Sequence, residues 1–470
     1  MTPKWGEITA GTIIAPIQGE LISGSHEVVL SGLSTDSRTI TQGELFWALK
    51  GERYDGHDFV RQTIDKGAAG AVIQKGYRAE LPTQTNFVLI AVNDTLKALG
   101  DLGNWWRKGY PIPVVAITGS VGKTTTKEMA ARILGLNALT LKNEGNLNNL
   151  IGLPLTLLLL RKAHRRAVLE MGMNQPGEIA RLTEIAAPDV GLITNVGRAH
   201  LEGLGDINAV ARAKVELLEK MSDKSQAILN GDDELLLRAA SPFQRKVTTF
   251  GLGPKNQIRA EKIQSLGKEG SAFHLRFAGQ AHPARLRVPG LQNVFNALAA
   301  SAIALCLEES PEQILEGLRG FEGLKGRFMI SHLPDGVILV DDTYNCNPAS
   351  LRAALESVKS LVTGEGRLLV GLGEMLELGD ETVPAHLEAG HMVAALGATY
   401  FLAMGEHAAQ MIEGAVSKGL PAERTTEVRS HEEMAQKIEA AMHEGDVILL
   451  KGSRKMQLEI VAEYLKGKNQ

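Results

Sequence analysis

The sequence is poor in cysteine and in aromatic residues, and it has no surplus of charge of either sign. Its two cysteines, Cys306 and Cys346, lie far apart among 470 residues, which excludes a disulfide framework and a cysteine-based zinc site. Lys and Arg number 50 against 54 Asp and Glu, so the basic surplus typical of nucleic-acid-binding proteins is missing. We therefore expect a protein with reduced thiols and no nucleic-acid partner.

Long apolar runs are also missing. The longest extends from Leu153 to Leu160 and includes Pro154 and Thr156, whereas a membrane-spanning helix needs about 20 apolar residues. The first residues lack the apolar core of a signal peptide. We expect a cytoplasmic protein that is not inserted in a membrane, and we take it to be a monomer.

Glycine, in contrast, is abundant: 50 residues, or about 11%, against a usual ~7%. These glycines follow no G-X-Y period and form no low-complexity block, so collagen and linker interpretations fail. They are expected at turns, or where the backbone approaches a ligand closely.

The length of the chain and two proline- or glycine-rich breaks predict three domains. At roughly 150 residues per domain, a chain of 470 residues corresponds to about three. The runs Tyr110-Pro111-Ile112-Pro113 and Gly323-Leu324-Lys325-Gly326-Arg327 are the two breaks, which predicts domains at 1–110, 111–325 and 326–470. Short apolar strands alternate with helices in the second and third parts, as the buried parallel strands of doubly wound sheets do.

The predicted fold class is therefore α/β. We expect a small α/β N-terminal domain, a central doubly wound and mostly parallel sheet, and a Rossmann-like C-terminal domain. Alternating segments between residues 246 and 289, such as Phe273-His274-Leu275-Arg276-Phe277, predict an antiparallel edge to the central sheet. Strands of the C-terminal domain are predicted at 337–340, 367–370, 399–403 and 447–450.

A glycine-rich loop follows the apolar strand predicted at 114–117 and precedes a helix from Lys123. It reads Thr118-Gly119-Ser120-Val121-Gly122-Lys123-Thr124-Thr125. This is the context of a P-loop, in which backbone N–H groups and a helix N-terminus hold phosphate. Lys123 is expected to reach the β- and γ-phosphates of ATP, and the Thr124 hydroxyl to contact Mg²⁺. Because Ile117 stands where the general pattern has glycine, an ordinary glycine-rich turn is the alternative.

Two polar residues follow the next predicted strands of the central domain. Glu170 ends the segment 167–169, and His200 lies one loop beyond the segment 190–193. Because ligands gather at the carboxyl ends of strands in open α/β sheets, both are candidate magnesium ligands. A solvated loop carboxylate and a structural histidine are the alternatives.

Two further features are ambiguous. Asn143, Asn146, Asn148 and Asn149 form a cluster that predicts either a capped turn or a group of amides facing a ligand. Lys214 lies in the middle of a predicted helix and, taken by itself, is expected to be a solvated lysine.

Together, these motifs resemble the Mur ligases, ATP-dependent amide-forming enzymes of peptidoglycan synthesis. The resemblance rests on the P-loop, the asparagine cluster, Glu170, Thr194-Asn195-Val196 with His200, and Ala213-Lys214-Val215-Glu216, and it extends over nearly the whole chain. Two C-terminal segments, 339–348 and 371–379, resemble the branch that joins D-alanyl-D-alanine to UDP-N-acetylmuramoyl-tripeptide. The tetrapeptide D-N-P-[RA] of the branch that adds diaminopimelate or lysine is missing from this sequence.

The resemblance implies a role for each matching residue. Lys123, Lys214 and His200 are the implied catalytic residues. Two Mg²⁺ ions are implied at Thr124, Glu170, His200 and Lys214, with Lys214 carbamylated so that it carries a carboxylate. ATP is expected to contact Gly119, Ser120, Val121, Gly122, Lys123, Thr124, Thr125, Arg327, Asn345 and Asn347. The UDP-sugar substrate is expected to contact Ser34, Thr35, Asp36, Ser37, Arg38, Asn146, Asn149, Thr194 and Asn195. Lys451-Gly452-Ser453-Arg454 also resembles a family signature, without an assigned role.

The implied reaction transfers the γ-phosphoryl group of ATP to the tripeptide carboxylate, and the dipeptide amine then attacks the acyl phosphate, releasing phosphate. The alternatives are a tripeptide-forming Mur ligase, a folylpolyglutamate synthetase, and a P-loop regulatory ATPase without ligase activity. About 110 residues precede the P-loop here, whereas folylpolyglutamate synthetases begin close to theirs. The sequence indicates no general base for the amine and no site for the dipeptide. Because three reactants must meet, we expect domain closure with hinges near 111–113 and 323–326.

Overall fold

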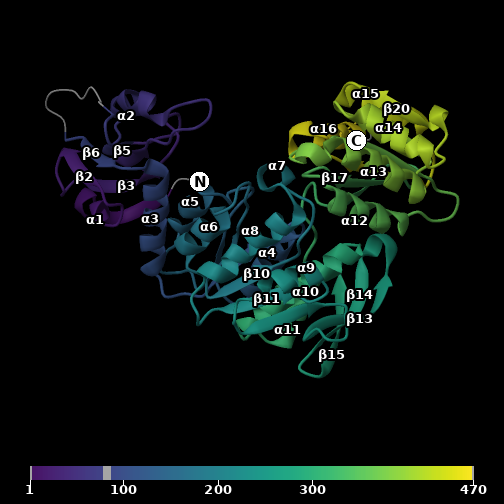
Figure 1. The fold of residues 1–470 in the computed structure, drawn as a ribbon, viewed down its shortest axis with the longest axis horizontal. Coiled ribbons are helices and arrows are strands. Elements are labelled where there is room, and N and C mark those ends of the chain that lie inside the picture. The colour runs from purple at the N-terminus through teal and green to yellow at the C-terminus, as the bar shows by residue number, and fades with distance from the viewer. Residues whose placement is uncertain (1–2, 78–85, 468–470) are drawn as a thin grey trace.

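The chain forms three α/β domains, each built around its own sheet. The computed structural model describes residues 3–77 and 86–467. The N-terminal domain, in purple, and the C-terminal domain, in green to yellow, both adjoin the central domain, in teal (Figure 1). This arrangement agrees with the predicted fold class. Within residues 3–77 and 86–467, no helix combines the length and the hydropathy needed to cross a bilayer.

The N-terminal domain has a mixed six-stranded sheet in the order β1-β3-β4-β5-β6-β2. Its four inner strands run parallel, and β1 and β2 pair antiparallel at the two edges. The buried Trp47 donates its indole N–H to Thr95 O at 2.8 Å, which fixes the sheet to the helix that follows it. The elements are β1 (Lys4–Thr9), α1 (Ala10–Ile14), β2 (Glu20–Ser23), β3 (Val29–Ser34), β4 (Glu44–Trp47), η1 (Gly56–Phe59), α2 (Val60–Asp65), β5 (Gly70–Gln74), β6 (Val88–Val92) and α3 (Thr95–Lys108).

The central domain has a nine-stranded sheet in the order β15-β14-β13-β12-β11-β10-β7-β9-β8. The chain order reverses at β7, and a reversal of this kind places ligands at the carboxyl ends of the strands. The elements are β7 (Val114–Thr118), α4 (Lys123–Gly135), β8 (Thr140–Lys142), α5 (Gly152–Leu157), β9 (Arg166–Glu170), α6 (Glu178–Ala186), β10 (Val190–Ile193), α7 (Leu201–Leu204), α8 (Ile207–Lys220), β11 (Gln226–Asn230), α9 (Glu234–Ala240), β12 (Val247–Gly251), β13 (Ile258–Ser265), η2 (Gly267–Glu269), β14 (Ser271–Phe277), β15 (Gln280–Leu286), α10 (Leu291–Cys306) and α11 (Pro311–Arg319).

The prediction of an antiparallel edge over 246–289 is correct only for its second half. β12 runs parallel to both β11 and β13, so the parallel sheet extends through residue 265. Only β14 and β15 add antiparallel strands. The alternating pattern of β13 reflects one solvated face near the end of the sheet, and alternation is not restricted to antiparallel strands.

The C-terminal domain has a six-stranded sheet in the order β16-β17-β21-β18-β19-β20. The five neighbouring strands β17, β21, β18, β19 and β20 run parallel, and β16 pairs antiparallel with β17 at one edge. The predicted strands correspond to β17, β18, β19 and β21, whereas the half-exposed edge strands β16 and β20 were missed. The elements are β16 (Met329–His332), β17 (Ile338–Asp342), α12 (Pro348–Lys359), β18 (Leu368–Gly373), η3 (Gly379–Glu381), α13 (Thr382–Ala395), β19 (Tyr400–Met404), α14 (Ala408–Ser417), η4 (Ala422–Arg424), β20 (Thr425–Val428), α15 (His431–Ala441), β21 (Val447–Lys451), η5 (Arg454–Met456) and α16 (Glu459–Gly467).

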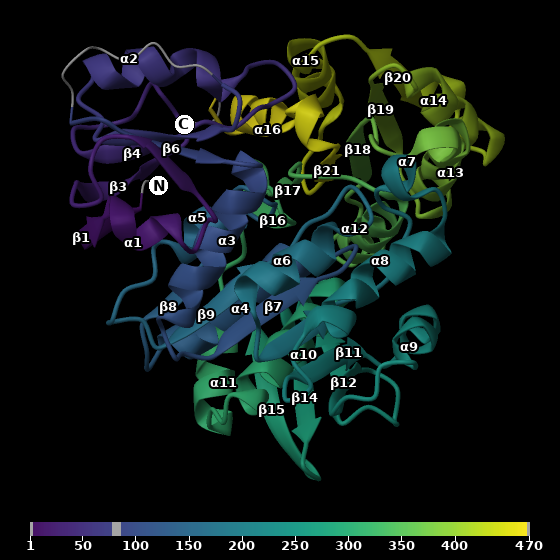
Figure 2. The same ribbon diagram turned by 60° about the vertical axis from the view of Figure 1, so that its left-hand side comes forward.

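Helix α3 joins the N-terminal domain to the central one. It lies along α5 and α6, as the turned view shows (Figure 2). Asn104 Nδ2 donates to Glu184 O at 2.7 Å, and Arg107 Nε donates to Ala186 O at 3.1 Å, so α3 satisfies carbonyl groups at the end of α6. The first predicted break, after residue 110, therefore follows a helix that already packs on the central domain.

Helices α13 and α14 cross at two glycines, and we expect this crossing to tolerate no side chain. A Cβ at Gly390 would lie 1.9 Å from Met411 O. The change Gly390→Ala should therefore lower the free energy of unfolding of the C-terminal domain by about 1–3 kcal/mol, measured by urea denaturation. Gly467→Ala is the matched control, because a Cβ there meets no atom within 4 Å. Equal stability of the two variants would contradict the close crossing.

Candidate active site

The P-loop requires glycine at two positions. Gly119 and Gly122 have φ angles of +145° and +87°, which side chains of L-residues rarely allow. A Cβ would lie 1.8 Å from Thr194 Oγ1 at Gly119, and 2.3 Å from Asn296 Oδ1 at Gly122. The loop thus passes so close to the residue after β10 and to α10 that only glycine fits.

The segment after β10 holds the P-loop in place. Val121 N donates to Asn195 Oδ1 at 2.9 Å, and Ser120 N donates to Asn195 O at 3.1 Å. The Thr194 hydroxyl donates to Val121 O at 2.7 Å. Thr194 and Asn195, predicted as substrate contacts, therefore support the phosphate loop in this conformation.

Lys123 folds back over the loop. Its Nζ donates to Gly119 O at 2.7 Å. Desolvation lowers the pKa of Lys123, and the nearby Glu170 carboxylate opposes this effect. Thr124 follows, and its Oγ1 accepts a hydrogen bond of 2.9 Å from Nη2 of Arg327. A residue of the C-terminal domain therefore contacts the hydroxyl that was predicted to meet Mg²⁺.

Glu170 ends β9 and is only 3% exposed, so the alternative of a solvated carboxylate is wrong. Asn148 Nδ2 donates to Glu170 Oε1 at 2.9 Å. The other oxygen, Oε2, is buried without a hydrogen-bond partner among the described residues, and Lys127 Nζ lies 4.0 Å from it. An unpartnered buried carboxylate oxygen, on a residue that lines the same cleft as the phosphate loop, fits a hard divalent cation.

Lys214 lies in α8 and is 1% exposed, so the interpretation as a solvated lysine is wrong. Burial and the charge of Lys123 hold the pKa of Lys214 well below its ordinary value. These surroundings favour the neutral amine, which is the nucleophilic form of lysine.

His200 precedes α7 and has a left-handed backbone with φ +58°. Its Nδ1 lies 2.8 Å from Oε2 of Glu377, a residue of the C-terminal domain. This hydrogen bond and the nearby Lys455 and Lys123 lower the pKa of Glu377, although partial burial opposes them. At this distance a glutamate carboxylate accepts a hydrogen bond from the imidazole N–H.

The asparagine cluster holds the turn before α5 and the end of β9, and part of it lines the cleft. Asn149 Oδ1 accepts from Gly152 N, the first backbone N–H of α5, at 2.9 Å. Asn143 is buried. Its Oδ1 accepts from Glu170 N at 2.8 Å, and its Nδ2 donates to Glu170 O at 3.0 Å. Asn148 bonds the Glu170 side chain, and Asn146 lines the cleft.

The C-terminal side of the site is built around Arg327 and Lys451. The Arg327 guanidinium lies 4.2 Å above the Tyr344 ring. Lys451 is 2% exposed, and its Nζ donates to Asp342 Oδ2 at 2.5 Å and to Asn345 O at 3.0 Å. Asp342 Oδ1 in turn accepts from Phe328 N at 3.0 Å, so this ion pair fixes the backbone next to Arg327 and at Asn345.

These groups line one cleft of about 1030 Å³ between the central and C-terminal domains. The predicted site residues along it are Ser120, Val121, Gly122, Lys123, Thr124, Thr125, Asn146, Asn149, Glu170, Thr194, Asn195, His200, Arg327, Asn345 and Asn347. Gly119 belongs to the same loop, and Lys214 is buried close enough to Lys123 for the two charges to interact. Among the described residues, Glu377, Asn148, Asn296 and Lys451 also line the cleft, and the sequence did not assign them roles.

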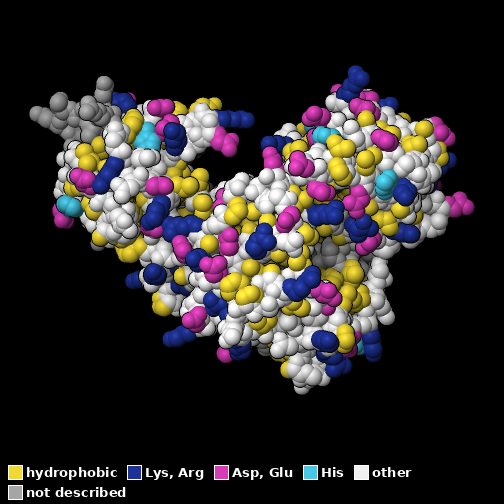
Figure 3. Space-filling view, viewed as in Figure 1, with side chains coloured by type: hydrophobic (Ala, Val, Ile, Leu, Met, Phe, Trp, Pro, Cys, Tyr) yellow, Lys and Arg dark blue, Asp and Glu magenta, His cyan; other side chains and the backbone are white. Residues whose placement is uncertain are grey.

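The turn at 34–38 lies apart from this cleft, in the N-terminal domain. Ser34 Oγ accepts from Asp36 N, and Arg38 binds the Asp36 carboxylate through two nitrogens, at 2.9 and 2.8 Å. Lys66 Nζ donates to Ser37 O at 2.7 Å. Figure 3 shows an open space between the N-terminal and C-terminal domains above the central domain.

A P-loop at the reversal point of one parallel sheet, facing a second Rossmann-like domain, defines a nucleotide-using protein of three α/β domains. Three family models match the chain: Mur ligase family, catalytic domain (29–106), Mur ligase middle domain (117–304), and Mur ligase, glutamate ligase domain (326–454). The chain belongs to the Mur ligase family, and it is accordingly an enzyme of the ligase class.

Individual relatives show which members of the family this chain resembles. The UDP-N-acetylmuramoyl-tripeptide–D-alanyl-D-alanine ligase of Bacillus subtilis (strain 168) is 34% identical over 97% of this chain and 98% of its own. A crystal structure of MurF from Acinetobacter baumannii superposes with a TM-score of 0.87 at 33% identity, covering 99% of this chain and 100% of that one. The structure of MurF ligase from Thermotoga maritima in complex with ADP superposes with a TM-score of 0.82 at 26% identity, covering 93% of this chain and 97% of that one.

The turn at 34–38 generates a prediction about pH. Its hydrogen bond from Arg38 lowers the pKa of Asp36 to about 2. In Arg38→Ala the pKa should rise toward ~3.9, measured by carboxyl ¹³C NMR titration. Because the folded-state pKa lies below the unfolded one, the pair stabilises the fold above about pH 4 and loses this effect as pH falls toward 2. An unchanged pKa in the variant would show that Arg38 is not the cause.

Proposed function

We propose that this protein joins D-alanyl-D-alanine to UDP-N-acetylmuramoyl-tripeptide through an acyl phosphate formed with ATP, with release of ADP and phosphate, in the synthesis of peptidoglycan precursors in the cytoplasm. The observation that carries the proposal is the convergence of the P-loop, Glu170 and His200 on one cleft with Arg327 and Asn345 of the C-terminal domain. The choice of substrates is supported by the similarity, over nearly the whole chain, to relatives named for this ligase reaction.

The chemistry begins with a carboxylate, which is a poor electrophile. Transfer of the γ-phosphoryl group of ATP to the tripeptide carboxylate gives an acyl phosphate, and the dipeptide amine displaces phosphate from it. The protein mainly positions anionic groups and neutralises their charge. The P-loop amides and Lys123 would hold the phosphates. Arg327, which donates a hydrogen bond to the Thr124 hydroxyl, would approach them from the C-terminal domain.

Magnesium fits the donor set at the base of the cleft. The Thr124 hydroxyl, the free Oε2 of Glu170 and the imidazole of His200 are the groups that would hold it, and bound Mg²⁺ supplies positive charge to the phosphate oxygens. Lys214, as a buried neutral amine, is suited to carbamylation by carbon dioxide, which would convert it to an anionic ligand. The low pKa of Lys214 supports this proposal.

We assign the UDP-sugar to the N-terminal domain, residues 1–110, ATP to the central domain, 111–325, and the closing face of the ATP site to 326–470. Ser34, Thr35, Asp36, Ser37 and Arg38 would contact the uridine end of the substrate. The substrate must then extend from this turn to the P-loop, with Asn146 and Asn149 near its path on the cleft wall.

Phosphate release with varied acceptors tests the function. We expect phosphate only when ATP, UDP-N-acetylmuramoyl-tripeptide and D-alanyl-D-alanine are all present, because the acyl phosphate forms on bound substrate and turns over only with the amine. Steady release without the peptide substrates would indicate a regulatory ATPase. Activity with diaminopimelate or lysine in place of the dipeptide would indicate the tripeptide-forming relative.

The proposed carbamate on Lys214 is testable by chemical rescue. Lys214→Ala should lose most ligase activity, because an anionic ligand disappears, and added formate or acetate should restore part of it. Product formation with and without the added acid is the measurement. Lys220→Ala, at the exposed end of the same helix, is the matched control and should keep full activity. A variant that short carboxylates do not rescue would count against the carbamate.

A further inference from the structure

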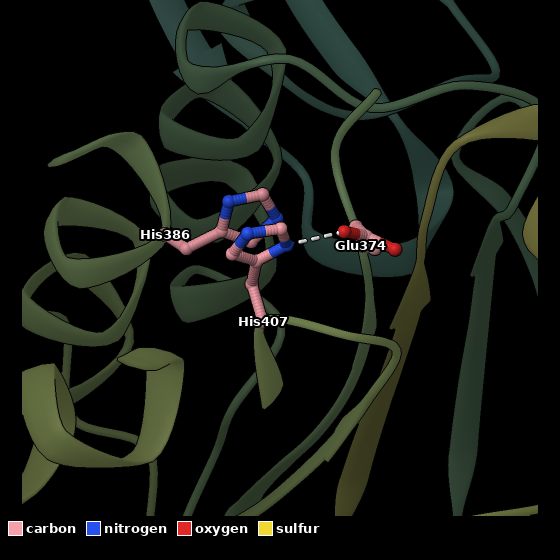
Figure 4. Close-up of side chains that lie close together, drawn as sticks. All are labelled: Glu374, His386 and His407. Carbon is pink, nitrogen blue, oxygen red and sulfur yellow. Dashed lines mark hydrogen bonds and ion pairs between the residues drawn. The ribbon is translucent and has the colours of Figure 1, made fainter. Parts of the chain in front are cut away.

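The loop that follows β18 is braced by two histidines and a carboxylate. His407 Nδ1 lies 2.5 Å from Glu374 Oε1, and its ring stacks on that of His386, with 4.9 Å between the ring centroids (Figure 4). His386 Nε2 accepts from Met375 N at 3.0 Å, and its Nδ1 donates to Thr382 O at 2.6 Å. Because the backbone occupies both nitrogens of His386, this cluster holds the loop and has no free lone pair there for a metal.

Ser453 holds the same loop from the other side. Its backbone N donates to Glu374 O at 3.1 Å, and its Oγ accepts from Leu376 N at 2.9 Å. Ser453 follows β21 and is 3% exposed. Three consecutive residues, Glu374 to Leu376, are therefore fixed before the chain reaches Glu377.

Glu377 meets His200 across the domain interface. Both residues have a left-handed backbone, with φ angles of +65° and +58°, which is uncommon outside glycine. Glu202 N also donates to Glu377 O at 3.3 Å. Two unusual backbone conformations, one from each domain, thus bring the carboxylate to 2.8 Å from His200 Nδ1. Backbone strain of this kind persists where the surrounding structure fixes it, often at functional sites.

The direction of this hydrogen bond determines which nitrogen of His200 is available. An ionised carboxylate only accepts, so Nδ1 carries the proton and the lone pair lies on Nε2. Metal-binding histidines commonly donate their second ring N–H to a carboxylate in this way, which fixes the tautomer and the ring orientation. The same arrangement is present here, with the carboxylate on a different domain from the histidine.

We propose that Glu377 is a positioning residue that sets the tautomer and orientation of His200 for a divalent cation. This inference rests on the proposed function, in which His200 holds Mg²⁺. It makes the cation site of the central domain dependent on docking of the C-terminal domain at α7. Removal of the carboxylate frees the imidazole to rotate and to exchange tautomers, although every direct ligand remains.

Mn²⁺ binding in the presence of ADP, measured by electron paramagnetic resonance, tests the proposal. Glu377→Ala should weaken Mn²⁺ binding by about 10–100-fold, and Glu377→Gln, which keeps an acceptor oxygen, should recover part of the loss. The matched control is Glu381→Ala, because Glu381 lies 3.8 Å from Arg198 across the same interface and does not touch His200. Equal weakening by Glu381→Ala would reduce the effect to domain docking and overturn the proposal.

A double-mutant cycle separates action through His200 from an independent role. In a His200→Ala background, Glu377→Ala should cause no further loss of Mn²⁺ affinity, and a full additional loss would overturn the proposal. In the metal-free protein at mildly alkaline pH, ¹⁵N NMR should show His200 protonated at Nδ1, and the variant should show a tautomer mixture. Protonation at Nε2 in the unaltered protein would also overturn it. These measurements use no peptide substrate, so failure of the ligase assay alone would refute the proposed function and not this inference.

Discussion

Two hydrogen bonds across the interface between the central and C-terminal domains organise the site. One joins Arg327 to the Thr124 hydroxyl at 2.9 Å, and the other joins Glu377 to His200 at 2.8 Å. In each, the central domain contributes a group suited to a cation and the C-terminal domain contributes a charged partner. The central domain supplies the phosphate loop and holds Glu170 by its own asparagines, whereas the Thr124 hydroxyl and the His200 imidazole are contacted from the neighbouring domain.

The buried lysines near the cleft differ in whether a carboxylate pairs with them. Lys127 lies 3.1 Å from Glu128, and Lys451 lies 2.5 Å from Asp342. A buried charge that is paired and hydrogen-bonded can remain ionised, whereas an unpaired one loses its proton instead. Lys214 has no carboxylate within ion-pair distance among the described residues, and Lys123 adds repulsion. Lys127 and Lys451 donate to the backbone carbonyls of Asn143 and Asn345, whereas burial and the charge of Lys123 lower the pKa of Lys214.

The sequence predicts the three-domain α/β fold because buried parallel strands leave continuous apolar runs, and it predicts the P-loop because the motif is local. The prediction fails where the pattern is weak: β16 and β20 are short, partly exposed edge strands, and β13 begins with alternating burial although it belongs to the parallel part of the sheet. Lys214 was misjudged from the residues alone, yet Val210 and Leu217 flank it at helical spacing and are buried. That spacing puts Lys214 on the buried face of α8, which is the signal that could have identified it.

Glu377 illustrates what a sequence cannot indicate. Nothing in the local sequence distinguishes Glu377 from the other carboxylates around the cleft, and the resemblance of the segment 371–379 to a family motif assigns it no role. Its significance comes from three long-range facts: the His386 and Ser453 contacts that fix the loop, the left-handed backbone at Glu377, and the matching conformation at His200. Each depends on packing between residues that are far apart in the chain. Because the carboxylate reaches His200 only when the two domains are docked, its role can be inferred only from the folded arrangement of both domains.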